Sequence, residues 1–64
     1  MPLAQLYIGP GRSHEQKKKL IENVTKAIVD TLGAKPEATW VMVNELPLSD
    51  WGVGGTPLGQ PKAP

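Results

Sequence analysis

Hydrophobic positions alternate at the start of the chain. In the segment PLAQLYI, one face of an extended strand carries Ala4, Leu6 and Ile8, and the other face carries Leu3, Gln5 and Tyr7. The turn-forming residues Gly9, Pro10 and Gly11 follow directly. This pattern predicts a largely buried strand over about residues 2–8.

The hydrophobic spacing becomes helical after Ser13. Ser13 and Gln16 form a capping-box pattern, in which the Ser13 hydroxyl accepts from the Gln16 amide and the Gln16 side chain returns to the cap. The apolar residues then recur with the helical period, at Leu20, Ile21, Val24, Ala27, Ile28 and Leu32. Because Gly33 suits the residue after a helix and Pro36 prevents its continuation, we expect a helix over about residues 13–32. The run 17–19 of three lysines is interpreted as its solvated face.

A second strand is expected over about residues 40–46, where WVMVNEL is aromatic and β-branched. The remainder, residues 51–64, is rich in Gly and Pro, and indicates a short hairpin near 52–55 followed by an arm. Strand, helix and strand make one α+β domain over residues 1–64, a β-α-β unit with parallel strands.

This domain is expected to assemble with other chains. A single helix covers only one face of the sheet, and the other face would expose Leu, Tyr, Trp and Met side chains to water. A chain of 64 residues is marginally stable alone, and with no cysteine and one histidine, His14, neither a disulfide nor a metal is expected to stabilise it. Self-association is the remaining route.

The charge balance points to a small ligand. The formal net charge is +1, so the chain has neither the basic surface of a nucleic-acid-binding protein nor an acidic tail. No apolar run approaches the roughly 20 residues of a membrane span, and the first residues do not resemble a signal peptide. We therefore expect a cytoplasmic protein with a small-molecule substrate.

Three features together resemble the 4-oxalocrotonate tautomerase group: the Met1-Pro2 start, the run GRSHEQK at 11–17 and the segment WGVGG at 51–55. The resemblance covers nearly the whole chain to Gly55. It implies a hexamer built as a trimer of dimers, removal of Met1, and proton transfer on keto and enol acids by the freed nitrogen of Pro2. It further implies that Arg12 binds carboxylate, that an aromatic residue such as Trp51 walls the pocket, and that no cofactor is needed.

The residue types support this chemistry independently. An N-terminal proline is a secondary amine, a base that can titrate near neutrality, and burial beside an arginine would lower its pKa towards the working pH. An arginine offers a fork suited to carboxylate and a charge for a developing oxyanion. Pro2 and Arg12 are therefore the predicted catalytic residues.

The predicted strand separates these two residues. Pro2 opens it and Arg12 lies beyond its far end, about six strand residues or roughly 20 Å away. An arginine side chain does not bridge that distance. If the two share a site, Arg12 must come from a neighbouring chain.

The start of the second strand departs from the family. Members that act on dicarboxylates have a second arginine there, and this chain has Trp40. Trp40 and Trp51 are predicted to contact the substrate, a small 2-oxo or 2-hydroxy-dienoic acid. Two alternatives stay open: a catalytically idle subunit that binds a small acid or assembles with a homologous partner, and a decarboxylase, hydratase or dehalogenase that uses the same residues.

Overall fold

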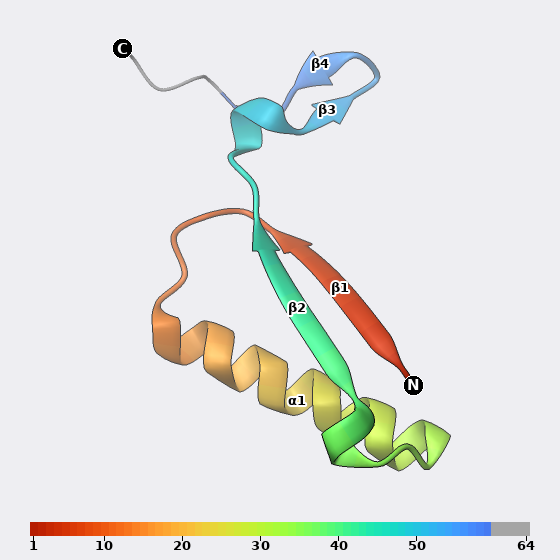
Figure 1. Cartoon of the computed structure of the whole chain (residues 1–64). Coiled ribbons are helices and arrows are strands. Elements are labelled where there is room, and N and C mark those ends of the chain that lie inside the picture. Colours follow the sequence, from red (N-terminus) through yellow and green to blue (C-terminus); the bar gives the residue numbers. More distant parts are fainter. Residues whose placement is uncertain (60–64) are drawn as a thin grey trace.

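The computed structural model describes residues 1–59 (Figure 1). In chain order the elements are β1 Leu3–Ile8, α1 His14–Leu32, the 3₁₀ helix η1 Pro36–Ala38, β2 Trp40–Glu45, the 3₁₀ helix η2 Leu48–Asp50, β3 Gly52–Val53 and β4 Thr56–Pro57. Strands β1 and β2 pair in parallel, from Leu3 opposite Trp40 to Ile8 opposite Glu45. The predicted β-α-β unit with parallel strands is confirmed.

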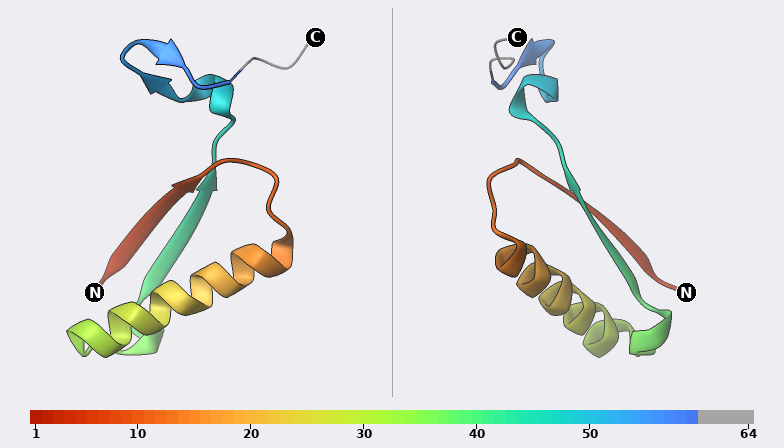
Figure 2. Two further views of the ribbon diagram at one scale, coloured as in Figure 1. Left: turned by 180° about the vertical axis from the view of Figure 1, so that it is seen from behind. Right: turned by 60° about the vertical axis from the view of Figure 1, so that its left-hand side comes forward.

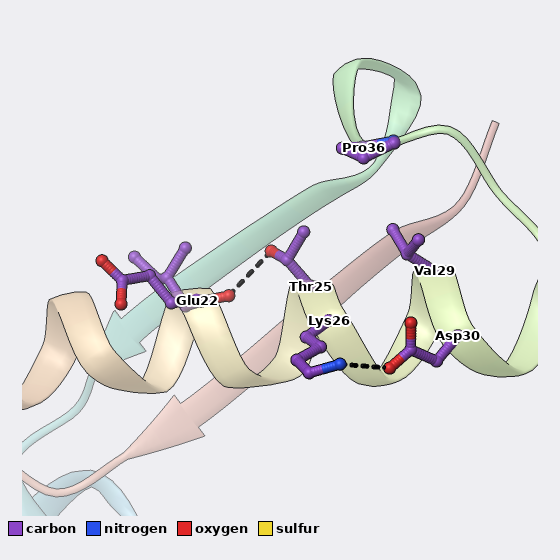
Figure 3. Close-up of a pocket in the computed structure, with 7 residues that line it drawn as sticks. Glu22, Thr25, Lys26, Val29, Asp30 and Pro36 are labelled. Atoms are coloured by element: carbon purple, nitrogen blue, oxygen red, sulfur yellow. Dashed lines mark hydrogen bonds and ion pairs between the residues drawn. The ribbon is translucent and has the colours of Figure 1, made fainter.

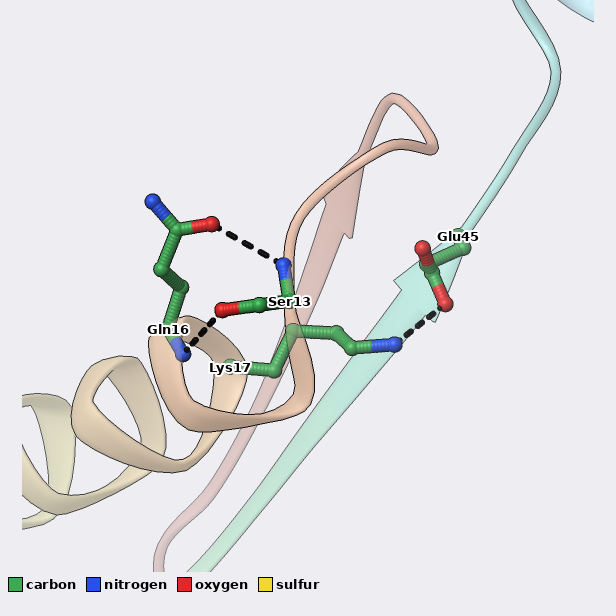
Figure 4. A network of polar contacts seen from close by, with 4 residues as sticks. All are labelled: Ser13, Gln16, Lys17 and Glu45. Atoms are coloured by element: carbon green, nitrogen blue, oxygen red, sulfur yellow. Dashed lines mark hydrogen bonds and ion pairs between the residues drawn. The ribbon is translucent and has the colours of Figure 1, made fainter.

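The ends of α1 are set by local hydrogen bonds. Ser13 Oγ accepts from the Gln16 amide at 3.1 Å, and the Ser13 amide donates to Gln16 Oε1 at 2.9 Å, which completes the predicted capping box (Figure 4). Gly33 ends the helix in the left-handed region, with φ 69°, and its N–H donates to the Val29 carbonyl at 3.0 Å. The sequence boundaries of the helix are therefore confirmed at both ends.

One face of the strand pair is covered and the other is open (Figure 2). Side chains alternate along β1, with Ala4, Leu6 and Ile8 half-buried on the covered face. On the open face Tyr7 is 58% exposed, Trp40 54% and Met42 45%. The described chain is only 14 Å across in its shortest direction, and none of its side chains counts as fully buried. A single chain thus lacks a closed core, and it leaves uncovered the sheet face that the sequence predicts to meet another chain.

The C-terminal segment forms a hairpin beside η2. Its strands flank Gly54 and Gly55, whose φ angles of 61° and 87° suit the two central positions of a tight hairpin turn. The predicted hairpin is confirmed, with its second strand at Thr56–Pro57, while the last part of the predicted arm lies outside the described residues. The two 3₁₀ helices were not predicted. The first begins at Pro36, and the second directly follows Pro47. No helix in residues 1–59 is long and apolar enough to cross a membrane.

Candidate active site

Pro2 and Trp40 meet at the edge of the sheet where both strands begin. The Trp40 amide donates to the Pro2 carbonyl at 3.0 Å, so the sheet holds Pro2 just before β1. Pro2 is half-buried, and the Trp40 side chain belongs to the open face, in register with Leu3. The two residues expected at this edge are therefore neighbours. We call them the Pro2 half-site.

Arg12 and Trp51 lie towards the opposite edge, where the strands end. Arg12 is exposed in the loop from β1 to α1, and Trp51 follows η2 (Figure 1). The Trp51 indole N–H donates to the Leu46 carbonyl at 3.1 Å, which fixes the half-buried ring against the turn after β2. We call Arg12 and Trp51 the Arg12 half-site.

The two half-sites do not meet within one chain. Strand β1 spans six residues between them, which at the usual rise corresponds to about 20 Å. An extended arginine side chain is much shorter. The structure thus agrees with the expectation that any site containing both Pro2 and Arg12 is completed by a second chain.

Arg12 lies beside both apolar and polar side chains. Arg12 lines a groove with Ile8, Gln16, Lys17 and Leu20. Lys17 Nζ pairs with Glu45 Oε1 at 2.7 Å, which connects the first turn of α1 to the end of β2 (Figure 4). Leu46 N–H donates to the Ile8 carbonyl at 2.9 Å, so the same edge is also held by the backbone.

A second groove lies between α1 and η1, away from both half-sites (Figure 3). The apolar side chains Ile21, Val29 and Pro36 line it, and the exposed ion pair of Lys26 Nζ with Asp30 Oδ2, at 2.6 Å, lies on its rim. The hydrogen bond to Asp30, and then its negative charge, raise the pKa of Lys26. None of the four predicted site residues lines this groove.

A comparison with protein families identifies the fold and its chemistry. A family model described as "Tautomerase enzyme" matches residues 2–60. The chain belongs to the tautomerase family. It is an isomerase of the 4-oxalocrotonate tautomerase type.

The relatives of this tautomerase match it along almost their full length. A 2-hydroxymuconate tautomerase from Comamonas testosteroni is 46% identical over 55 residues, which are 86% of this chain and 87% of that protein. Among solved structures, a 4-oxalocrotonate tautomerase isozyme from Methylibium petroleiphilum has a TM-score of 0.81 and 40% identity, over 89% of this chain and 92% of the other. A heterohexamer 4-oxalocrotonate tautomerase from Chloroflexus aurantiacus has a TM-score of 0.82 and 28% identity, over 91% and 94%.

Sequence reasoning misjudged one residue near Arg12 of this tautomerase. Lys17 was interpreted as part of a solvated helix face, but its side chain is 27% exposed and bound to Glu45. Its spacing was the available signal, because Lys17 precedes Leu20 and Ile21 by three and four residues and so lies on the apolar stripe of α1. Among residues 1–59 no cluster of metal-binding side chains occurs.

Proposed function

We propose that this tautomerase interconverts the keto and enol forms of a small 2-oxo acid, with Pro2 as general base after Met1 has been removed. Membership of the family supports tautomerase chemistry, and the position of Pro2 at the start of a strand supports its role as the base. With Met1 attached, the Pro2 nitrogen is a tertiary amide and has no basicity. Processing of Met1 is therefore part of the proposal.

The reaction requires a proton to move between two atoms of the same substrate. In the direction from enol to keto, the free Pro2 nitrogen takes the proton of the enol hydroxyl, the conjugated electrons shift, and the nitrogen returns the proton to a carbon. In the reverse direction it takes the proton from that carbon and returns it to the oxygen. A base contributes about 10²–10⁴-fold when its pKa lies near the working pH. Arg12 binds the substrate carboxylate through its fork and stabilises negative charge that develops on oxygen.

The opposite placement of the two half-sites carries this proposal. Because Pro2 and Arg12 lie at opposite edges of one sheet, a neighbouring chain must supply Arg12 to each Pro2. A strand running antiparallel beside β1 would bring them together, since β1 is an edge strand with an unpaired side. We propose a single-domain chain that assembles as a trimer of dimers in the cytoplasm, either with itself or with a homologous subunit.

The two tryptophans are proposed to contact the substrate. Trp40 lies beside Pro2 on the open face, and Trp51 is fixed at the edge that carries Arg12. In an antiparallel arrangement of two β1 strands, the end that carries Trp40 in one chain would adjoin the end that carries Trp51 in the next. Both tryptophans would provide flat apolar walls for the part of the substrate that Arg12 does not bind.

Mixing two inactive variants tests the shared site. Pro2→Ala and Arg12→Ala are each expected to lose at least tenfold in kcat/KM, because one lacks the cyclic amine and the other the anion clamp. When the two are unfolded together and reassembled in equal amounts, about a quarter of the sites combine an intact Pro2 with an intact Arg12 from the other chain. Activity should return to about a quarter of the parent value.

Two measurements control this experiment. Intact mass must show that Met1 is absent from the parent and from both variants. Each variant reassembled alone should stay inactive. If no mixing ratio restored activity, the shared site would be contradicted. If both single variants kept full activity, the mechanism would be contradicted.

A further inference from the structure

Two cations and one carboxylate meet at the groove beside Arg12. Arg12 and Lys17 both line the groove, and so does Ile8, the residue in register with Glu45 at the end of β2. Glu45 does not line the groove itself but is next to Ile8 across the sheet, and its carboxylate binds Lys17 Nζ at 2.7 Å. Both members of this pair are partly shielded, with side chains 27% and 36% exposed.

The backbone on both sides of Arg12 is constrained. Gly11 has φ 113°, a conformation that side-chain-bearing residues rarely adopt, and Ser13 is held by the capping box. The Lys17 amide also donates to the Ser13 carbonyl at 3.1 Å. The backbone thus fixes where the Arg12 side chain begins, and within the described residues its guanidinium forms no salt bridge.

A free Glu45 carboxylate would compete for that guanidinium. Arginine binds carboxylates bidentately, and a carboxylate of the same chain next to the groove has the advantage of high effective concentration over a dissolved substrate. The ammonium of Lys17 removes this competitor.

We infer that Lys17 is a positioning residue, which holds Glu45 and thereby leaves Arg12 free to bind the substrate carboxylate. The inference rests on the proposed function, which assigns the carboxylate to Arg12. It predicts that loss of Lys17 and loss of the Glu45 charge have different effects on substrate binding. Loss of Lys17 releases the competitor, whereas loss of the Glu45 charge removes it.

Three variants of the pair and one control test the inference. Lys17→Met, Glu45→Gln and the double variant are compared with Lys26→Met, which breaks the exposed Lys26–Asp30 pair far from Arg12. Two quantities are measured: kcat/KM for an enol acid, and the Kd of benzoate, an unreactive carboxylate, by isothermal titration. Lys17→Gln repeats the test if methionine disturbs assembly.

The expected pattern is a loss that a second substitution repairs. Lys17→Met should weaken benzoate binding and lower kcat/KM about tenfold, mostly through KM, which is within the usual coupling range of a charge network. Glu45→Gln, the double variant and Lys26→Met should all stay within about threefold of the parent. In a protein that already carries Arg12→Ala, Lys17→Met should change neither the Kd of benzoate nor kcat/KM.

Other patterns would overturn the inference. Equal losses for Lys17→Met and Glu45→Gln, with matching decreases in Tm, would mean that the pair only stabilises the fold. A double variant as weak as Lys17→Met would mean that Lys17 binds the carboxylate itself. If the parent turns over no enol acid, the proposed function fails, while the benzoate series still decides the role of Lys17.

Discussion

At the scale of single residues, Trp40 distinguishes the Pro2 half-site. Its amide fixes the Pro2 carbonyl, and its indole lies on a face of β1 and β2 that carries Leu3, Gln5, Tyr7, Met42 and Asn44 but no charged side chain. In the proposed site, Arg12 of another chain is then the cation left for the substrate, because Lys17 is paired with Glu45, and Trp40 adds an aromatic wall. Such a site suits an acid with one carboxylate and an apolar or aromatic tail.

Substitution of Trp40 by arginine is expected to change the preferred substrate. The parent should favour a phenylpyruvate-like enol monoacid over a hydroxymuconate-like diacid. Trp40→Arg should raise the diacid-to-monoacid ratio of kcat/KM about tenfold, the equivalent of roughly 1.4 kcal/mol for a new charge-assisted contact. The measurement is kcat/KM for one substrate of each kind, at matched pH and salt.

Met42→Arg is the matched control for this substitution. Met42 lies on the same open face of β2, two residues farther from Pro2, and is 45% exposed. The substitution Met42→Arg adds the same charge away from the Pro2 half-site and should leave the diacid-to-monoacid ratio of kcat/KM unchanged. A parent that prefers the diacid, or equal shifts in both variants, would show that Trp40 only packs between chains.

At the scale of elements, the first turn of α1 positions Arg12. Ser13, the N-cap of α1, comes one residue after Arg12, and the left-handed Gly11 turns the chain one residue before it. Both devices act on neighbours in the sequence. The position of Arg12 therefore depends on local backbone chemistry as well as on the ion pair of Lys17 with Glu45.

Removal of the helix cap should cost stability. Ser13→Ala leaves the Gln16 amide without its acceptor and is expected to destabilise the protein by about 1 kcal/mol per chain. Urea unfolding at one fixed protein concentration measures the effect, because the stability of an oligomer depends on concentration. Gln16→Ala keeps the Ser13 acceptor and should cost less. Equal midpoints for Ser13→Ala and the parent would contradict the importance of the cap.

At the scale of the whole molecule, a single chain lacks a closed hydrophobic core. One helix covers one face of a two-stranded sheet, the other face exposes Leu3, Tyr7, Trp40 and Met42, and the described residues contain no fully buried side chain. A two-stranded sheet with one uncovered apolar face is not expected to persist in water. Assembly supplies the missing core and, in the proposed function, the missing half of the site.

Light scattering of the purified protein should therefore show an oligomer, with the mass of a hexamer or, failing that, of a dimer. Tyr7→Glu places a charge on the open face, where the side chain is 58% exposed in the single chain. It should dissociate or unfold the assembly and abolish turnover together. Glu15→Lys, which changes an exposed helix residue, is the control. A stable monomer at micromolar concentration would contradict both the assembly and the shared site.

The sequence by itself determined the two main strands, the helix between them and the ends of that helix. The alternation in residues 2–8, the helical stripe and the signals at Ser13 and Gly33 depend on neighbours along the chain, so their outcome follows from local hydrogen bonds and side-chain periodicity. They also sufficed to predict that Pro2 and Trp40 share an edge, because parallel strands begin at the same end of a sheet.

Only the tertiary structure decided which distant residues meet. The pairing of Lys17 with Glu45, 28 positions apart, depends on the angle and depth at which α1 packs on β2, and neither follows from hydrophobic periodicity. The Trp51 ring is a local exception: it binds the Leu46 carbonyl only five positions away, but through the turn at η2, which the sequence did not predict. Local interactions determine each element, but contacts between elements depend on packing. A buried polar side chain forms its hydrogen bonds with the partners that the folded chain places beside it.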